Sequence, residues 1–469
     1  MMMDLIRLPA RSVRDLLKDR QVSPLELLDA LEHRISEVDG AVNALPTLCF
    51  ERARQRAREK DLSDLPLAGI PVAIKDLLPV SGVRTTFGSM AYRDHIPEAS
   101  DLLVERIEAA GGIVYAKSNT PEFGAGANTF NDVFGFTRNP WNTALSAAGS
   151  SGGSAVALAT GMAWLATGSD LGGSLRNPAS FCSIVGLRPS QGRIASAPGE
   201  TAFNRLSMEG PMARNVNDAA MLLDVMAGYD SRDPMSLDDP AESFEEAAIR
   251  EHVPTRIAFS PDLGVTPVDP EVAEICERAA LRFEELGGHV ERAQPDFSGL
   301  QDVFQVHRAL SFATSLGPEL EANRDTFKPE IVWNVEKGLA LTGQDIMNAM
   351  VERSEIYRRA NTFFSDFDLI LTPATVVPPY PVEQRFVQRV GDHEFSNYIE
   401  WCSIAYAFTV LGAPALSVPC GFTQSGLPVG LQIAAPVREE ARLLAAASAL
   451  ENLLRLSGAL PIDPRAPDS

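Results

Sequence analysis

Apolar residues near the N-terminus recur at helical intervals. Residues 10–38 predict two helices, and Ser23-Pro24 marks the start of the second with a capping hydroxyl and a first-turn proline. The apolar positions of this second helix are Leu27, Leu28, Leu31, Ile35 and Val38. We therefore expect residues 1–65 to form an N-terminal helical arm.

From residue 66 onward, short apolar runs alternate with helical stretches. The runs at 69–74 and 112–116 each lead into a lysine and predict buried strands, with a helical stretch near 101–110 between them. Later runs at 257–260 and 369–371 are also typical of strands, whereas the acidic segment 229–252 is expected to be an exposed excursion. This alternation predicts a layered α/β domain.

The composition is that of an ordinary globular protein, which excludes disorder as the main state. Hydrophobic residues make up 45% and charged residues 22% of the 469 residues. With 41 Lys+Arg against 62 Asp+Glu, the net charge is −21, which disfavours binding to nucleic acid or to an anionic membrane. No apolar stretch has the length of a signal peptide or a membrane span, so we expect a cytoplasmic protein.

The five cysteines carry no metal or disulfide pattern. They lie far apart, without a CxxC pair and without a histidine at zinc spacing. We expect them to be reduced and mostly buried, and we expect neither a metal nor a cofactor.

Two motifs indicate chemistry that their surroundings do not allow. VAIK at 72–75 matches the lysine strand of protein kinases, but only Gly40 and Gly69 precede Lys75 and no His-Arg-Asp loop follows. GSSGG at 149–153 matches the nucleophile elbow of α/β hydrolases with Ser151 as nucleophile, yet residues 143–148 make a poor central strand. The four later histidines, expected to be surface or capping residues, are His252, His289, His307 and His393.

A serine hydrolase with so few histidines needs another base, and lysine can serve. Burial favours the free amine of a lysine, and Lys75 lies at the end of a buried-looking strand. Serines lie in two glycine-rich loops, 149–154 and 168–176, where successive backbone N–H groups can converge on an oxyanion. The alternatives are a solvent-facing strand end for Lys75 and simple tight turns for the loops.

Taken together, these motifs resemble the amidase signature family of Ser-cis-Ser-Lys hydrolases. Lys75 and Ser150 are 75 residues apart and Ser150 and Ser174 are 24 apart, which also fits that family. Besides the two glycine loops, the matching segments are LAGIPVAIKD at 67–76, KSNTPEF at 117–123, FGFTRNPW at 134–141, GLRP at 186–189, GPMAR at 210–214, GAPALSVP at 412–419 and GLPVGLQ at 426–432.

The resemblance implies a fold and a division of the chain. It implies a single large three-layer α/β/α domain with a central mixed sheet over residues 66–460. The signature core is expected at about 66–220, and a variable region that shapes the substrate pocket at about 230–400.

The resemblance also implies three catalytic residues. Ser174 is expected to be the acylated nucleophile and Lys75 the base. Ser150, behind a cis Gly149–Ser150 peptide bond, is expected to pass the proton between them.

Further residues of the two loops take supporting roles by the same resemblance. The N–H groups of Leu171, Gly172, Gly173 and Ser174 are expected to hold the oxyanion. Gly124 and Ala125 are expected to line the acyl pocket.

Asp170 and Arg176 are expected to brace the second loop, with a clamp for a substrate carboxylate as the alternative role of Arg176. Ser151 and Ser154 are expected to order the first loop and cap the helix after it. The sequence departs from the common family pattern at Ala147-Ala148, before the serine pair, and at Ser169, where threonine is frequent.

The family contains stand-alone amidases and the glutamine-hydrolysing component of the bacterial aminoacyl-tRNA amidotransferase, which supplies ammonia to its partners. SQGRIASAP at 190–198 differs from the segment usual in that component, so we expect a stand-alone amidase. It would hydrolyse a small carboxylic amide, and also aryl amides, esters or carbamates, to an acid and an amine or ammonia. The alternatives are the glutaminase component of the amidotransferase and a non-catalytic member of a complex.

Substrate preference is expected to depend on residues 300–400. The aromatic candidates in this region, which have core packing as their alternative role, are Trp333, Phe395, Tyr398 and Trp401. The expected partner is a small-molecule amide, with a second copy of the chain in a homodimer.

Overall fold

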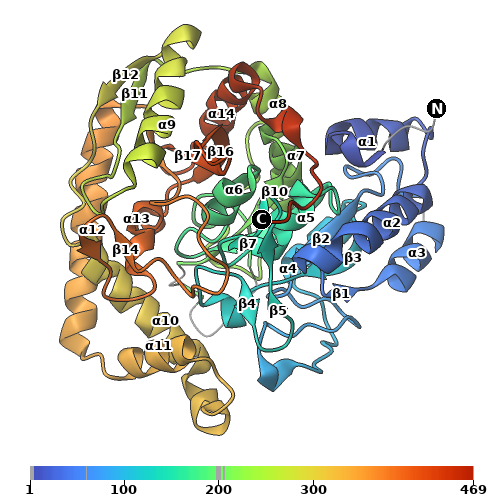
Figure 1. Cartoon of the computed structure of the whole chain (residues 1–469), viewed down its shortest axis with the longest axis horizontal. Helices are drawn as coiled ribbons and strands as arrows, with labels where there is room; N and C mark the ends of the chain where they lie inside the picture. Colours follow the sequence, from blue (N-terminus) through green and yellow to red (C-terminus); the bar gives the residue numbers. More distant parts are fainter. Residues whose placement is uncertain (1–4, 60, 197–201, 204–205, 468–469) are drawn as a thin grey trace.

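An 11-stranded mixed sheet crosses the molecule, and helices flank it (Figure 1). The computed structural model describes residues 5–59, 61–196, 202–203 and 206–467. In spatial order the strands are β1 (Thr47–Leu48), β3 (Ile113–Ser118), β2 (Pro71–Lys75), β8 (Leu165–Asp170), β10 (Met208–Ala213), β9 (Val185–Arg188), β16 (Ala415–Phe422), β17 (Pro428–Ala434), β13 (Leu369–Pro373), β11 (Arg256–Phe259) and β12 (His289–Arg292). This arrangement confirms the predicted α/β class with a central mixed sheet.

Three short hairpins lie outside the main sheet. They pair β4 (Phe130–Asn131) with β5 (Gly135–Phe136), β6 (Arg138–Asn139) with β7 (Asn142–Ser146), and β14 (Arg389–Val390) with β15 (His393–Glu394). Because β7, which leads toward the first glycine loop, is not part of the central sheet, the α/β-hydrolase elbow is excluded.

The helices come from all parts of the chain. They are α1 (Ala10–Lys18), α2 (Pro24–Val42), α3 (Phe50–Glu59), α4 (Leu102–Ala109), α5 (Gly152–Ala159), α6 (Arg176–Cys182), α7 (Val216–Met226), α8 (Phe244–Arg250), α9 (Pro270–Leu281), α10 (Leu300–Asn323), α11 (Pro329–Leu339), α12 (Gly343–Asp366), α13 (Ser403–Leu411) and α14 (Glu440–Leu454).

The N-terminal helices form where the sequence predicts them. Ser23 and Glu26 make a reciprocal capping box at the start of α2, with Pro24 in its first turn. The apolar face of α2 is buried in the same core cluster as the strands β2, β3 and β8. The division into an arm and a main domain stays a prediction.

The acidic segment 229–252 differs from its prediction as an exposed excursion. Its second half forms α8, where Phe244, Ala247 and Ala248 are buried, and α8 packs against α7 and α14. Burial of this apolar face holds the segment against the molecule.

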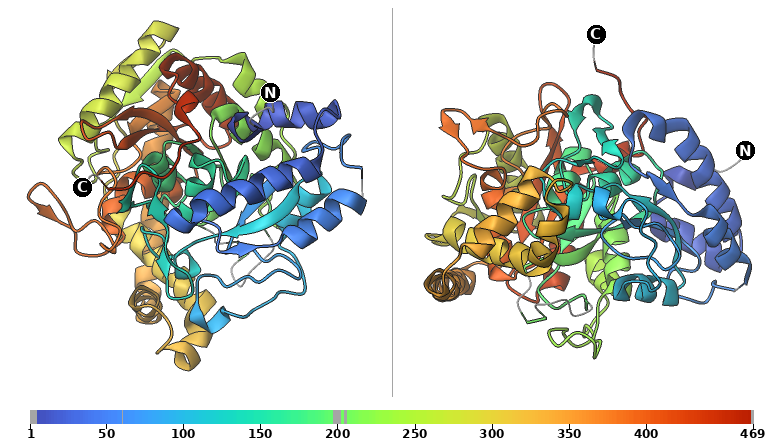
Figure 2. Two further views of the ribbon diagram at one scale, coloured as in Figure 1. Left: turned by 45° about the vertical axis from the view of Figure 1, so that its right-hand side comes forward. Right: turned by 90° about the horizontal axis from the view of Figure 1, so that it is seen from below.

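The N-terminal helices and the long helices α10 and α12 lie at opposite ends of the molecule (Figure 2). Parts of α10, α12 and α13 form a second core cluster against the other half of the sheet. The region between the two ends holds both glycine-rich loops.

Candidate active site

Parallel pairing of β2 with β8 brings the ends of two predicted motifs together. Val72 pairs with Leu165 and Ala73 with Ala166, so both strands run toward the same edge of the sheet. Lys75 is the last residue of β2 and Asp170 the last of β8. The two glycine-rich loops meet at this edge.

Lys75 is fully buried and is surrounded by serine hydroxyls. Its Nζ lies 2.7 Å from Ser150 Oγ, 2.9 Å from Ser151 Oγ and 2.9 Å from Ser169 Oγ. Burial lowers the pKa of Lys75 to about 7, although the carboxylates of Asp170 and Glu209 oppose the shift. A large fraction of this amine is therefore neutral at physiological pH.

The hydroxyl of Ser151 accepts a hydrogen bond from Lys75 and does not donate to it. Ser151 Oγ donates to the carbonyl of Ser169 at 3.3 Å, and this uses its one proton. The neutral amine then has its lone pair free for a proton from Ser150, the nearest of the three hydroxyls.

The first glycine loop contains a cis peptide bond between Gly149 and Ser150, as the resemblance implies. Ala148, one of the departures from the family pattern, has a φ of 56°. This left-handed conformation costs an alanine about 1–2 kcal/mol. The Ala148 methyl is fully buried in the second core cluster.

The predicted helix-capping role of Ser151 and Ser154 is wrong. Ser151 occupies the N-cap position of α5, but its side chain makes no capping bond because it contacts Lys75 and Ser169. Ser154 Oγ donates instead to the carbonyl of Thr167 at 2.8 Å. Both serines tie the first loop to β8.

Asp170 braces the second loop from inside. Its carboxylate accepts the N–H of Gly173 at 2.8 Å and of Leu175 at 3.1 Å, and it pairs with Arg176 at 2.8 and 3.0 Å. Burial acts to raise the pKa of Asp170, but Arg176 and Arg188 outweigh it and hold the pKa well below its usual range.

The alternative role of Arg176 as a clamp for substrate is wrong. Its side chain is fully buried, and besides Asp170 it donates to the carbonyl of Ala405 and to Gln432 Oε1, both at 2.6 Å. These partners leave Arg176 outside the cavity described below.

The N–H of Gly173 differs from its expected role because it is bonded to Asp170. Gly173 has a φ of 106°, a conformation that glycine adopts without strain and that turns the loop back on Asp170. The donors that we propose for an oxyanion are therefore the N–H groups of Leu171, Gly172 and Ser174.

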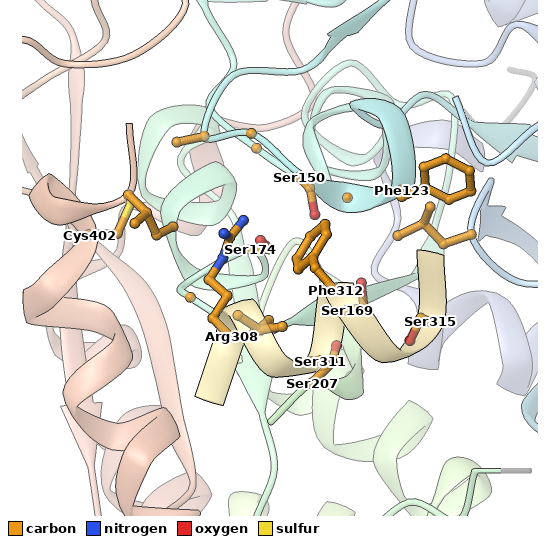
Figure 3. A pocket seen from close by; sticks show the side chains of 18 of the residues that line it. Phe123, Ser150, Ser169, Ser174, Ser207, Arg308, Ser311, Phe312, Ser315 and Cys402 are labelled. Atoms are coloured by element: carbon orange, nitrogen blue, oxygen red, sulfur yellow. The ribbon is translucent and has the colours of Figure 1, made fainter. Parts of the chain in front are cut away.

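A cavity of about 300 Å³ contains Ser150 and Ser174 (Figure 3). Its described lining also includes Ser169, Asn177 and Gly124, and helix α10 closes one side. The residues that α10 contributes are Arg308, Ser311, Phe312, Ser315 and Leu316. In Figure 3, Phe312 extends from this helix toward Ser150.

Some predicted pocket residues lie elsewhere. Ala125 does not line the cavity but packs in a small core cluster with Leu316 and Phe327, because the chain turns between Gly124 and Gly126. The four aromatic candidates from 300–400 are core residues of the second cluster or pack against it: Trp333, Phe395, Tyr398 and Trp401.

His307 is a further correction. It is buried in α10, where neither ring nitrogen has a hydrogen-bond partner, and burial lowers its pKa to about 4. All five cysteines are free thiols, and Cys49 alone is partly exposed.

Sequence reasoning missed Ser169 as a direct partner of Lys75 and missed the whole α10 wall. The only signal for that wall was helical spacing, which places residues 308, 311, 312, 315 and 316 on one face.

Two further searches of the described ranges gave negative results. No group of three or more His, Cys, Asp or Glu side chains there is arranged to hold a metal ion. No helix in that part of the chain is long and apolar enough to cross a membrane.

Comparisons with known proteins agree with this geometry. The amidase family model matches residues 26–444. An acylamidase of Rhodococcus erythropolis is 34% identical over 454 aligned positions, which cover 94% of each chain. The glutamyl-tRNA(Gln) amidotransferase of Moorella thermoacetica has a component, its A chain, that is 36% identical; the match covers 96% of this chain and 97% of that one.

Among solved structures, a bacterial aryl acylamidase of the amidase signature family superposes with a TM-score of 0.89. It is 27% identical, and the match covers 97% of this chain and 99% of that one. The chain therefore belongs to the amidase family and is a hydrolase of carbon–nitrogen amide bonds.

Proposed function

We propose that this chain is a stand-alone amidase in which Ser174 is acylated by a small carboxylic amide. The observation that carries the mechanism is a buried, partly neutral lysine bonded to Ser150 at the cavity that Ser174 also lines. The products are a carboxylic acid and an amine or ammonia.

The first half-reaction forms the acyl-enzyme. Ser174 Oγ attacks the amide carbonyl while its proton moves to Ser150, whose own proton moves to Lys75. The N–H groups of the second loop hold the oxyanion. The same relay then returns a proton to the amide nitrogen, and the carbon–nitrogen bond breaks.

The second half-reaction releases the acid. A water molecule takes the place of the amine and loses its proton through Ser150 to Lys75 as it attacks the acyl carbon. Collapse of the second tetrahedral intermediate returns the proton to Ser174 Oγ and releases the carboxylic acid. Esters are expected to react as well, because they form the same acyl-enzyme.

General base catalysis of this kind typically contributes about 10²–10⁴-fold to the rate. Removing one oxyanion donor typically costs about 10²–10³-fold. The bracing of the second loop by Asp170 matters because it fixes the direction of those donors.

The 36% identity to the Moorella thermoacetica amidotransferase component keeps a second candidate function, glutamine hydrolysis within a partner complex. Segment 190–198 disfavours it. Of residues 190–198, the structure describes only 190–196. A non-catalytic role in a complex is disfavoured because Lys75, Ser150 and Ser174 are all present.

The test is labelling of the purified chain with a fluorophosphonate, located by peptide mass spectrometry, alongside turnover of aliphatic, aryl and carbamate substrates and glutamine. We expect label on Ser174 and amine release from a non-glutamine amide by the lone chain. Ser174→Ala should lose the label and at least about 10³-fold in rate. Label elsewhere, or glutamine as the only substrate, would overturn the proposal.

We further propose a cytoplasmic homodimer without nucleic-acid or membrane partners, consistent with a net charge of −21. Sedimentation velocity tests the dimer against the chain mass of 50.6 kDa.

A further inference from the structure

A single charged side chain lines the cavity of Ser174 among the described residues. It is Arg308, from the middle of α10, and only 3% of its surface is exposed. Figure 3 shows Arg308 reaching from α10 toward the side of the cavity on which Ser174 lies.

The partners of this guanidinium are neutral. Nη1 donates to Asn334 Oδ1 and Nη2 donates to Tyr398 Oη, while Nε has no hydrogen-bond partner. No carboxylate in the described part of the chain forms an ion pair with it. The rings of Phe312 and Tyr398 lie 4.6 and 5.1 Å from its central carbon and hold it in position.

Tyr398 does not supply the missing negative charge. Burial raises the pKa of this phenol, and this outweighs the opposite effect of Arg308, so the side chain stays protonated. Its oxygen also accepts the Nδ2 of Asn334 at 2.6 Å. The cluster of Arg308, Asn334 and Tyr398 therefore carries a net charge of +1.

Other buried arginines of this chain are neutralised. Arg176 pairs with Asp170 at 2.8 Å, and Arg193 pairs with Glu440 at 3.2 Å. A buried cation without a counterion is costly, because the protein replaces neither its water nor its opposite charge. Beside a reactive serine, a substrate can bring that counterion.

We infer that the amide substrate carries a carboxylate that pairs with Arg308. This inference rests on the proposed function and names its substrate class: a small amide with one carboxylate a few bonds from the cleaved carbonyl. The guanidinium retains unused N–H groups, and a carboxylate accepts two of them side by side.

The rest of the cavity limits the size and charge of this substrate. Phe123, Phe312 and Leu316 make apolar walls, and about 300 Å³ is the size of a small organic molecule. One cation in such a space favours a monoanion. Ser311 lies one helical turn from Arg308 on the same face of α10 and offers a further hydroxyl donor.

The experiment compares pairs of amides that differ only in charge. On the acyl side, succinyl p-nitroanilide is paired with its neutral isostere, 4-oxopentanoyl p-nitroanilide. On the amine side, N-butanoyl-4-aminobenzoate is paired with N-butanoyl-4-aminoacetophenone. We expect the wild-type kcat/KM to favour the charged member of one pair by about tenfold or more, and the favoured pair shows which side carries the carboxylate.

Arg308→Met should abolish or reverse that preference, mainly through KM. Arg353→Met is the matched control, because Arg353 is a largely buried arginine that donates to the carbonyl of Val410 and does not line the cavity. It should keep the preference. No preference for charge in either pair, or a preference that survives in Arg308→Met, would overturn the inference.

Failure of the proposed function gives a different result. If no amide is cleaved, calorimetry still measures binding of the two charged probes and their neutral isosteres to the unmodified chain. Tighter binding of a charged probe that is lost in Arg308→Met but not in Arg353→Met would uphold the anion site without the reaction. Equal binding within both pairs would refute the anion site as well.

Discussion

The amine of Lys75 sets the pH range of the proposed reaction. Because burial holds its pKa at about 7, the neutral base is lost as the pH falls. We expect kcat/KM to drop about tenfold per pH unit well below pH 7 and to level off above pH 8. A pH–rate profile with a neutral amide measures this.

Lys75→Met removes the base but keeps most of the side-chain volume. The variant should lose about 10²–10⁴-fold in rate. Its residual activity should no longer show the acid limb. A limb unchanged in the variant would assign the titration to another group.

At the scale of single residues, the sequence predicted the reacting groups better than the walls of the cavity. Lys75, Ser150 and Ser174 stand in motifs whose residue types are tied to one chemistry, and the structure brings Lys75 and Ser150 within 2.7 Å. Arg308 stands in no motif, and only the folded chain shows that its partners are neutral.

Among the structural elements, the loop after β8 depends on one carboxylate. Asp170→Asn leaves Arg176 buried without its charge partner, which typically costs about 3–5 kcal/mol. We expect this loss in the free energy of unfolding from urea titration. The matched control is Glu242→Gln in the exposed pair with Arg250, for which less than about 1 kcal/mol is expected.

The close packing of α10 on α11 gives a second prediction at this scale. A Cβ at Gly338 of α11 would lie 2.1 Å from the carbonyl oxygen of Ala309 on α10, so the helices must move apart. Gly338→Ala should destabilise the chain by about 1–3 kcal/mol. It should also raise KM, because α10 carries the cavity wall.

Gly317→Ala, within α10 itself, is the control. A Cβ there meets only Leu339, at 3.9 Å, so the higher helix propensity of alanine should stabilise the chain by about 0.5–1 kcal/mol. A stabilising effect of Gly338→Ala would show that the two helices are not tightly packed in solution.

Element positions followed from local patterns, whereas their pairing did not. The apolar runs at 69–74 and 112–116 became β2 and β3, within one or two residues of the predicted bounds. Nothing local indicated that β10 would pair antiparallel between β8 and β9, because strand order depends on contacts across the whole chain.

At the scale of the whole molecule, a buried carboxyl joins α14 to α7. Glu451 accepts the N–H of Val216 at 2.9 Å, and burial raises its pKa to about 8. Between the ordinary pKa near 4.5 and the raised value, the folded chain keeps a proton that the unfolded chain releases. Glu451 therefore makes stability fall as pH rises, by up to about 1.4 kcal/mol per unit.

Glu451→Gln keeps an acceptor for Val216 and removes the titration. Urea unfolding at pH 5, 6.5 and 8 should show a smaller loss of stability with pH in the variant than in the wild type. Glu274→Gln, on the exposed side of α9, is the control and should follow the wild type. Identical slopes in all three proteins would exclude Glu451 as the source.

The cavity is built from two separate stretches of the chain, and this has a consequence for how such an enzyme can change. The lysine and both reacting serines belong to residues 75–174, whereas the opposite wall is one face of α10. Substitutions along that single helix can redirect the enzyme to new amides while the bond-breaking apparatus is inherited intact. For a protein engineer, α10 is the natural target of a focused library.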